Sequence, residues 1–501
     1  MFVAALSGPC AAQDSGDEFS VTLLVTSEVR GAVFPVNKYA TQCTLSYYEA
    51  NPHKCYGGAA RRKTILEQRD AQNTVTIDAG AYFYGSGLFY PLFLGQASNE
   101  FFGSARYDAW GLNYRDLSQW DGTFFKDYVA AARAVYPELP PAVHTNLNLT
   151  GDPNLTDEEV APYSLTALED GRRLAFLSLA DPSYLQSLQP GYADRHMSYS
   201  TSVTNALAQL RRLPEGEPDV IVCHMSSPPR PTAAHQAYAG MHFHSLAYAI
   251  SCHLILSIPR IHAPLWWRAE ASSGDKDPFL QAQDNLVLDL IKQSVGIDIF
   301  IMTLVGILDG AEVTQLRNAA GDHVLLVMAT TSSAGRYMSN ITARFGASGL
   351  LLPEQVRVNS IDLSSEMQAH NATWDRVLEY EQNMTIAMGQ IKGHIAADLS
   401  GSSGSGPNCI SVEWGEDGTA CGCRVAQCGA GDLTADAIAW YTKADIGVSN
   451  AGGIRSDLSS GAVTRGDLLA VLPFLNQVLR ARYPADTHPG PCRSTCHTEH
   501  A

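Results

Sequence analysis

The chain has 501 residues, of which 45% are hydrophobic and 17% charged, a composition typical of a globular protein and not of a disordered one. This length allows two or three domains with their own cores. The formal net charge of −17 excludes nucleic acids and anionic membranes as general partners, because those are bound through clustered Lys and Arg side chains. A small phosphorylated ligand stays compatible with the charge, since one local pair of Arg residues can hold it.

Cysteine usage and glycosylation sequons favour a secreted or extracellular/lumenal protein. The chain has 11 cysteines, and Asn-x-Ser/Thr sequons occur at Asn148, Asn154, Asn340, Asn371 and Asn383. Residues 1–18 are a candidate for a partial signal segment, although Met1–Gln13 lacks a positive n-region. No run is long and apolar enough for a transmembrane helix, and the C-terminus lacks the hydrophobic tail of a lipid-anchor signal.

Short apolar runs in the first 350 residues predict a layered α/β domain, because strands alternate with helices. The expected strands are Val21–Val25, Thr74–Asp78, Asp219–Cys223 and Leu254–Leu256, and the expected helices are Thr64–Arg69 and Ala233–Ser251. His323–Met328 and Tyr337–Phe345 are expected to pair with each other and close the domain.

The next segment predicts a connection between two domains. Ser360–Ile391 has apolar residues at loose helical spacing and no glycine before Gly389, which predicts a long connecting helix. The Gly-Ser run Gly401–Gly406 predicts a flexible loop.

The stretch Cys423–Phe474 contains the pattern that points most directly to a ligand. Ile446-Gly447-Val448 predicts a short strand that leads into the turn Asn450–Arg455. Backbone N–H groups of glycines in such a turn can approach an anion closely, and Arg455 offers a planar fork for phosphate or carboxylate. Alone, such a turn is more often only a turn.

Four fragments of this stretch, in their order and spacing, resemble the C-terminal nucleotide-binding domain of the 5′-nucleotidase family, which includes apyrases and bacterial UDP-sugar hydrolases. The fragments are Cys423–Cys428, Gly431–Ala437, Asn450–Arg455 and Gly466–Phe474. The resemblance implies that a nucleotide is held by Arg424, Asn450, Arg455 and Phe474, with Gly452 and Gly453 in the turn. The Arg residues would pair with anionic groups, Asn450 would hydrogen-bond, and the Phe474 ring would stack on a base.

Cysteine pairs bracket short loops at two places where the same family has disulfides. These pairs are Cys43 with Cys55 and Cys423 with Cys428, and Cys409 with Cys421 is a third candidate. The alternative is a zinc site built from Cys421, Cys423, Cys428, Cys492, Cys496 and His497, although these spacings match no common zinc finger.

The N-terminal half resembles the dinuclear metallophosphoesterase domain of the family. The matching segments are Phe19–Glu28, Tyr56–Arg61, Asp78–Gly80, Arg106–Ala109 and Val220–His224. The family's chemistry needs two metal ions held by Asp, His and Asn side chains at strand ends.

Most of these ligand positions are changed. Glu28 and Arg30 stand where the family has Asp and His, Ala81 replaces the bridging Asp, and Tyr114, Arg115 and Asp116 replace Asn, His and Glu. His224 matches a ligand, whereas the last metal signature aligns with Ser257–Ile261 and offers none. The substitutions predict a degenerate site with no confident cofactor or catalytic residue, in which Glu28 and His224 are the only vestige.

Arg30 and Arg115 allow two interpretations. They could hold a phosphate without hydrolysing it, or they could pair with Glu28 and Asp116 and neutralise a vestigial cleft. His242, His244, His253 and His262 are interpreted as ordinary histidines, since residues two apart on a helix lie on different faces.

The predicted fold is therefore α/β and α+β. Residues 19–355 form a four-layer α/β/β/α domain, residues 356–392 a linker helix, residues 393–480 a smaller α+β nucleotide-binding domain that looks truncated, and residues 481–501 a divergent tail. The truncation predicts an uncovered sheet edge.

The leading functional hypothesis is a secreted 5′-nucleotidase-like protein that binds a nucleotide or related phosphate ester without turnover. One alternative is an active phosphoester hydrolase with a rearranged site at Glu28, Asp78, Asp116 and His224, which would need divalent metals of the zinc or manganese type. The other is a non-catalytic secreted interaction protein.

Overall fold

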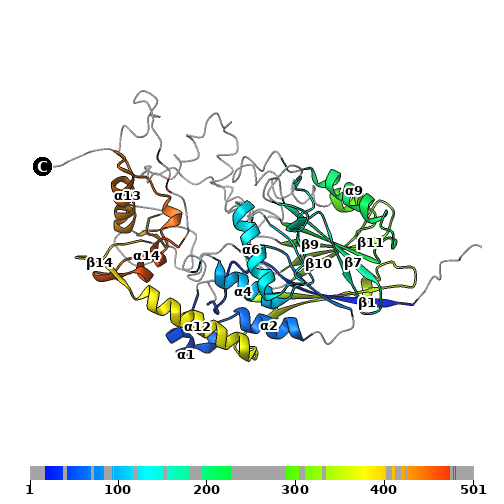
Figure 1. Ribbon diagram of the computed structural model, residues 1–501, viewed down its shortest axis with the longest axis horizontal. Helices are drawn as coiled ribbons and strands as arrows, with labels where there is room; N and C mark the ends of the chain where they lie inside the picture. Colours follow the sequence, from blue (N-terminus) through cyan, green and yellow to red (C-terminus); the bar gives the residue numbers. More distant parts are fainter. Residues whose placement is uncertain are drawn as a thin grey trace, which may run out of the picture. The chain divides into compact units, whose positions relative to one another are not determined.

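The computed structural model describes residues 17–37, 42–43, 45–68, 73–83, 93, 95–113, 116, 122–149, 155–180, 195, 197–226, 289–303, 311–329, 334–401, 409–411, 419–423, 427–473, 478 and 480. These residues fall into two compact units, and the boundary lies between Ile386 and Ala387, inside one helix (Figure 1). Several expected features lie outside the described residues: Met1–Gln13, the helix Ala233–Ser251, the strand Leu254–Leu256, the four ordinary histidines, most of Gly401–Gly406, and residues 481–501.

The first unit contains a five-stranded sheet in the order β13-β12-β1-β2-β3. Its strands are β1 (Phe19–Thr26), β2 (Thr74–Asp78), β3 (Ala109–Trp110), β12 (Tyr337–Phe345) and β13 (Arg357–Asp362). β1 runs parallel to β2 and antiparallel to β12. Most of β1 is buried, as expected for a β-branched strand covered on both faces.

A second sheet has the order β10-β11-β9-β8-β7-β6. Its strands are β6 (Ser164–Ala167), β7 (Arg173–Ala180), β8 (Val220–Ser226), β9 (Ile299–Thr303), β10 (Glu312–Arg317) and β11 (His323–Ala329). The neighbours β7, β8, β9 and β11 are parallel, so their carboxyl ends meet at one edge.

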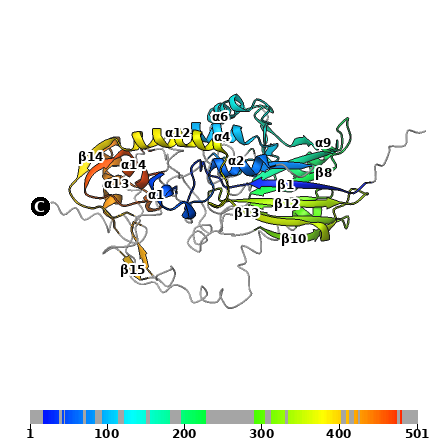
Figure 2. The ribbon, with the colours of Figure 1, turned by 90° about the horizontal axis from the view of Figure 1, so that it is seen from below.

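The two sheets pack face to face through apolar side chains such as Leu23 and Ile77 from the first and Phe176 and Ile301 from the second. Helices α2 (Ala59–Glu67), α4 (Gln96–Ala105) and α6 (Gly122–Val135) cover the outer face of the first sheet (Figures 1 and 2). Helix α9 (Tyr199–Leu210) covers the outer face of the second. The predicted α/β/β/α layering is confirmed.

The expected pairing of His323–Met328 with Tyr337–Phe345 is wrong. β11 lies between β9 and β10 in the second sheet, whereas β12 lies between β1 and β13 in the first. Both runs do form strands, because they are apolar and β-branched. Such a pattern identifies a buried strand but not its partner.

The expected helix over Ser360–Ile391 is also longer than the observed one. Helix α12 spans Asn371–Met388, and Ser360 belongs to strand β13, which pairs with β12. Asn359 and Ser360 are poor helix formers. The residues on either side of them, Val358 and Ile361, pack against two different apolar cores. The helix begins where His370 caps it: ring Nδ1 accepts the backbone N–H of Thr373 at 3.2 Å.

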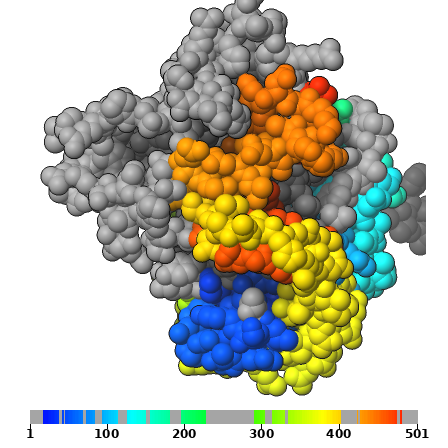
Figure 3. Space-filling model, turned by 90° about the vertical axis from the view of Figure 1, so that its left-hand side faces the viewer, coloured from blue at the N-terminus to red at the C-terminus, as the bar shows by residue number. Residues whose placement is uncertain are grey.

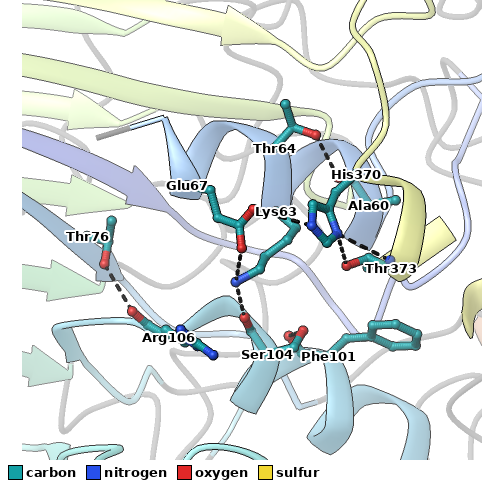
Figure 4. A network of polar contacts seen from close by, with 10 residues as sticks. All are labelled: Ala60, Lys63, Thr64, Glu67, Thr76, Phe101, Ser104, Arg106, His370 and Thr373. Atoms are coloured by element: carbon teal, nitrogen blue, oxygen red, sulfur yellow. Dashed lines mark hydrogen bonds and ion pairs between the residues drawn. The ribbon is translucent and has the colours of Figure 1, made fainter. Parts of the chain in front are cut away.

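The start of α12 is tied to α2 by polar contacts (Figure 4). His370 donates its backbone N–H to the carbonyl of Ala60 at 3.1 Å, and Thr64 Oγ1 donates to the carbonyl of Gln368 at 2.9 Å. Glu67 on α2 lies 2.9 Å from Lys63 Nζ and 3.4 Å from His370 Nε2. These contacts orient α12 on the first unit, in which its first four turns lie.

The second unit is a small α+β domain, as predicted. Its elements are β14 (Ile391–Ile395), β15 (Cys409–Ser411), β16 (Thr419–Cys421), α13 (Gly429–Thr442), a 3-10 turn η4 (Ala451–Gly453), β17 (Gly461–Thr464) and α14 (Arg465–Val471). β14 pairs with β17 and β15 with β16. Helix α14 starts with a reciprocal capping box between Thr464 and Asp467.

The strand expected at Ile446-Gly447-Val448 is not formed. These residues pair with no strand in the described part of the chain, and Ile446 and Val448 are exposed. Gly447 lies against α13, where a Cβ would overlap the carbonyl oxygen of Ala435. The apolar run is thus packed on a helix on one side, and no described strand lies beside it to make it part of a sheet.

Disulfides join Cys43 to Cys55 and Cys423 to Cys428, as predicted. The second bond removes two ligands from the alternative zinc site. Cys409 lies directly opposite Cys421 in the β15–β16 register. No helix among the described residues combines the length and apolarity needed to cross a membrane.

Candidate functional site

The segments that match the family's metal-binding signatures meet at the carboxyl ends of neighbouring strands. Glu28 follows β1, Asp78 ends β2, and Asn113 follows β3 in the same sheet. Backbone bonds join the loops after β1 and β2: Glu28 donates to the carbonyl of Gly80 at 3.0 Å and Arg30 to that of Ala81 at 2.7 Å. The topology therefore brings these residues together.

The backbone at these loops is unusual. Glu28, Arg30 and Ala81 all have positive φ, at 53°, 53° and 58°. A non-glycine residue in this region costs on the order of 1–3 kcal/mol, and such strain concentrates at functional sites. Arg30 and Ala81, at two positions where the family has metal ligands, thus adopt an energetically costly backbone conformation although their side chains are a guanidinium and a methyl group.

Glu28 is buried and its carboxylate is fully used. Oε2 accepts from Arg30 Nε at 2.8 Å, and Oε1 accepts from Asn113 Nδ2 at 3.1 Å. The Arg30 side chain is 29% exposed and the Glu28 side chain 2%. Arg30 is thus the counter-ion of Glu28, as the second interpretation of this arginine expects.

Asp78 is buried among hydroxyl and backbone donors. Oδ2 accepts from Thr26 Oγ1 at 2.6 Å, and Oδ1 accepts from the N–H of Gly80 at 3.0 Å. Burial raises the pKa of Asp78 to about 8, and repulsion from Asp116 acts in the same direction. The group is therefore largely protonated at neutral pH, which is unfavourable for metal binding.

Asp116 holds the neighbouring loops together through hydrogen bonds. Its carboxylate accepts from the backbone N–H of Ala81 at 2.7 Å, of Asn113 at 3.0 Å and of Phe83 at 3.3 Å. Burial raises its pKa to about 6, although the backbone donors oppose that rise. Tyr114 and Arg115 lie outside the described residues, so the pairing of Arg115 with Asp116 stays a prediction.

His224 is fully buried on β8 and held between two hydroxyls. Nδ1 lies 2.9 Å from Ser178 Oγ on β7, and Nε2 lies 3.0 Å from Thr303 Oγ1 on β9. Burial lowers the pKa of His224 to about 3, so the ring is neutral, with one nitrogen donating and the other accepting. Both ring nitrogens are occupied.

The roles of Ser178 and Thr303 could not be predicted from the sequence, because a single hydroxyl side chain near a strand end is not part of a recognisable motif. The last metal signature aligns with Ser257–Ile261, which lies outside the described residues, so this alignment stays a prediction. The strand beside β8 is β9, which ends at Thr303. The three residues that follow it, Leu304-Val305-Gly306, contain no carboxylate or imidazole.

These residues do not fit a pair of divalent ions. Nowhere among the described residues do three or more His, Cys, Asp or Glu side chains gather as a metal would require. The charge of Glu28 is neutralised by the guanidinium of Arg30. Asp78 and Asp116 accept hydrogen bonds from donors of the same chain. Both ring nitrogens of His224 are hydrogen-bonded to hydroxyl groups. What the arrangement achieves is a closed hydrogen-bond network at the strand ends.

The turn in the second unit is arranged differently. Asn450 Oδ1 accepts the N–H of Gly452 at 2.9 Å and so caps η4. The backbone N–H of Arg455 donates to the carbonyl of Val471 at 2.8 Å, which fixes the turn to α14. The buried side chains of Ala451 and Ile454 anchor it in the small core.

The polar groups of this turn face outwards. Asn450 and Arg455 are exposed, and a Cβ at Gly453 would meet no atom within 4 Å. Arg455 Nη1 donates to the carbonyl of Gly452 at 3.4 Å. Arg424 and Phe474 lie outside the described residues, so the structure brings together Asn450, Gly452, Gly453 and Arg455.

Comparisons with known proteins agree with the motifs. Residues 407–483 match the family described as "5'-nucleotidase, C-terminal domain". A snake venom 5′-nucleotidase from Crotalus adamanteus is 31% identical over 111 residues, which is 22% of this chain and 18% of the venom protein. One from Naja atra is 31% identical over 101 residues, 20% of this chain and 18% of that protein. The aligned part is thus about a fifth of the length of these relatives.

The fold is similar to solved structures over most of the chain. The 5′-nucleotidase precursor of Thermus thermophilus superposes with a TM-score of 0.54 at 20% identity, covering 91% of this chain and 74% of that one. The NAD nucleotidase of Haemophilus influenzae gives a TM-score of 0.56 at 13% identity, covering 91% and 75%. The predicted resemblance to 5′-nucleotidases is confirmed, with an N-terminal metallophosphoesterase-like domain and the C-terminal domain.

Proposed function

We propose that this chain is a secreted 5′-nucleotidase-like protein that binds a nucleotide or a related phosphate ester in its C-terminal unit and does not hydrolyse it. The observation that supports the loss of hydrolysis is the pairing of Glu28 with Arg30. A guanidinium occupies the electrostatic role of a metal ion there, and it cannot lower the pKa of a bound water as a metal does.

The binding half of the proposal rests on the exposed turn. Asn450 and Arg455 are exposed and flank two glycines, which place no side chain in the way of an anionic group. Arg424 and Phe474 would complete the site with a second cation and a stacking ring. Secretion is supported by the two disulfides and by exposed sequon residues such as Asn148, Asn371 and Asn383.

The deciding experiment measures metal content and phosphate release on the purified full chain. AMP, ADP and UDP-glucose would be supplied with zinc or manganese. We expect no stoichiometric metal and no phosphate release. Two metals per chain with turnover that is lost in His224→Ala would instead support the rearranged hydrolase.

Nucleotide binding is then measured by calorimetry on the wild type and on Arg455→Ala. Removing a charged hydrogen-bond donor should weaken binding by about 1.5–3 kcal/mol. Arg344→Ala is the matched control, because Arg344 is a half-exposed arginine paired with Glu18 in the first unit. Equal affinity of all three proteins would contradict a site at this turn and favour the non-catalytic interaction protein.

A further inference from the structure

One buried carboxyl group of the first unit lies outside the strand-end loops. Glu381 is on helix α12 and is 2% exposed. It shares one face of the helix with Trp374, Val377 and Met384, because residues three and four positions apart lie above one another. Val377 and Met384 are buried apolar side chains. The pattern of this face therefore predicts an apolar residue at position 381, where the chain has a carboxyl group.

The loop closed by the Cys43–Cys55 disulfide lies against this face of α12. In the loop, the ring of Tyr48 lies 5.1 Å from the ring of Trp374. Directly before the loop, Gln42 Nε2 donates to Met384 Sδ at 3.6 Å. Figure 3 shows the two segments side by side at the surface, with the part of the chain that contains the loop in blue and the part that contains α12 in yellow.

Glu381 lies on α12 between these two contacts. The backbone N–H of Leu45, the first residue of helix α1 (Leu45–Ala50), donates to its carboxyl group. The oxygen Oε2 is buried and has no hydrogen-bond partner in the part of the chain that the structure describes. Helix α1 lies beside α12 in Figures 1 and 2, and none of its residues is buried. Little apolar burial therefore holds α1 in place.

Among the described side chains, no cation compensates the Glu381 carboxyl group. Burial raises its pKa to about 7, the N–H of Leu45 opposes that rise, and no charged side chain contributes. The guanidinium of Arg376 on the same helix is bound by Glu100 on α4, with Nε and Oε1 2.7 Å apart. The other charged or titratable groups on the elements around Glu381 are Tyr47, Tyr48, Glu49, His53 and Lys54 in the loop, Arg61 on α2, and Asp375, Glu379 and Tyr380 on α12.

We propose that Glu381 makes the seating of the Cys43–Cys55 loop on α12 depend on pH. The protonated carboxyl group keeps the loop in place, because a neutral group is buried at low cost. The ionised carboxylate releases the loop, since a buried charge without a counter-ion is strongly unfavourable and hydration relieves it.

The release is a local event. The base of the loop is fixed by the disulfide and by two backbone hydrogen bonds between Val36 and Tyr56, at 2.8 and 2.7 Å. A helix as short as α1 is not stable by itself, so it depends on the surface against which it lies. Water can therefore reach Glu381 when the loop moves, without unfolding of the first unit.

The direction of the pH dependence follows from the raised pKa. The seated loop binds the Glu381 proton more tightly than the released loop, in which the hydrated carboxyl group titrates near its usual pKa of about 4.3. The stabilisation of the seated loop is therefore complete below about pH 4.3 and is lost as the pH rises through about 7.

Hydrogen exchange of the full chain tests the proposal when it is read by mass spectrometry at pH 5 and pH 8 and corrected for the intrinsic exchange rate. The protection of a peptide that covers Leu45–Ala50 should fall at least about tenfold between the two pH values. A peptide from β7 reports global unfolding and should stay protected at both. Equal protection of the α1 peptide at the two pH values overturns the proposal, and so does a parallel loss in both peptides.

Variants separate the proton from the shape of the side chain. Glu381→Gln keeps an oxygen for the N–H of Leu45 but cannot ionise, so the loop should stay protected at pH 8. Glu381→Leu supplies the apolar residue that the helix face predicts and should behave in the same way, which covers the case that the amide disturbs folding. Asp375→Asn is the matched control, because Asp375 is an exposed carboxylate on the same helix, and it should keep the wild-type pH dependence. A pH dependence that survives in both Glu381 variants overturns the proposal.

A second measurement needs no variant. Brief hydroxyl-radical labelling should modify Met384, which is 4% exposed, more strongly at pH 8 than at pH 5, because the released loop uncovers it. Met338 is buried in the core and serves as the internal reference, whose labelling should not change. Equal labelling of Met384 at the two pH values would contradict the release of the loop.

Discussion

The strand-end loops of the first unit and the Asn450–Arg455 turn of the second use polar groups in opposite ways. In the loops, the carboxylates of Glu28, Asp78 and Asp116 are buried and accept hydrogen bonds from donors of the same chain. In the turn, Asn450 and Arg455 are exposed beside an open glycine. Both resemble ligand sites of one family, yet only the second leaves groups directed towards solvent.

Under the proposed function, this difference shows how a site can lose its ligand without losing its architecture. The loops keep three left-handed non-glycine residues and the backbone bonds between them. The ion pair and the hydrogen bonds of Glu28 would then supply the stabilisation that a bound metal contributes in the family. Mutations in the strand-end loops should therefore change the free energy of unfolding, whereas mutations in the Asn450–Arg455 turn should change the affinity for the ligand.

The largest expected effect is on Arg30→Ala. Removal of the guanidinium leaves the buried carboxylate of Glu28 without the positive charge of Arg30, while the hydrogen bond from Asn113 stays, and this should cost about 2–4 kcal/mol of unfolding free energy. Urea denaturation would measure it.

Glu28→Gln provides the matched background. Because a neutral amide needs no counter-ion, Arg30→Ala should cost much less there, and the double-mutant cycle should report a coupling above about 1 kcal/mol. The same loss in both backgrounds would show that Arg30 does not serve as the counter-ion.

The next effect concerns pH. The folded-state pKa of Asp78 is raised to about 8, so the folded protein binds this proton more tightly than the unfolded chain does. Its contribution to stability is complete below the unfolded pKa of about 3.9 and is lost as pH rises through 8. Asp78→Asn should flatten the dependence of unfolding free energy between pH 5 and pH 8 by about 1–3 kcal/mol.

Denaturation at several pH values would measure that slope, with Asp127→Asn as the control, since Asp127 is an exposed carboxylate on α6. The control should keep the wild-type slope. If Asp78→Asn kept it too, the buried proton would have to be assigned elsewhere.

Much of this contrast could be anticipated from the residues, and the part that could not has a physical reason. β-branched runs located β1, β2 and β8 to within a few residues, because burial on two faces demands such runs. Replaced ligands at Arg30 and Ala81 are visible in the sequence. The use made of the remaining groups is not, because hydrogen bonds such as Thr303 to His224 join residues 79 positions apart.

The sequence also does not predict which strands pair with each other. β11 and β12 carry similar apolar patterns but belong to different sheets, and the run at Ile446–Val448 has a strand's pattern but pairs with no strand that the structure describes. Pairing depends on which other edges are available in three dimensions, a property that a local pattern does not encode.

The smallest effect on stability is expected at Asn450, where capping and ligand binding can be separated. Asn450→Ala removes the acceptor of the Gly452 N–H and should cost about 0.5–1 kcal/mol, seen as faster hydrogen exchange in a peptide containing Gly452. Asn450→Asp keeps an acceptor oxygen at that position, so exchange should stay near the wild-type rate. Its negative charge would nevertheless repel an anionic ligand, and nucleotide affinity should fall at least as far as in Asn450→Ala. Unchanged affinity in Asn450→Asp would mean that this asparagine is only a cap, and the binding role would then rest on Arg455.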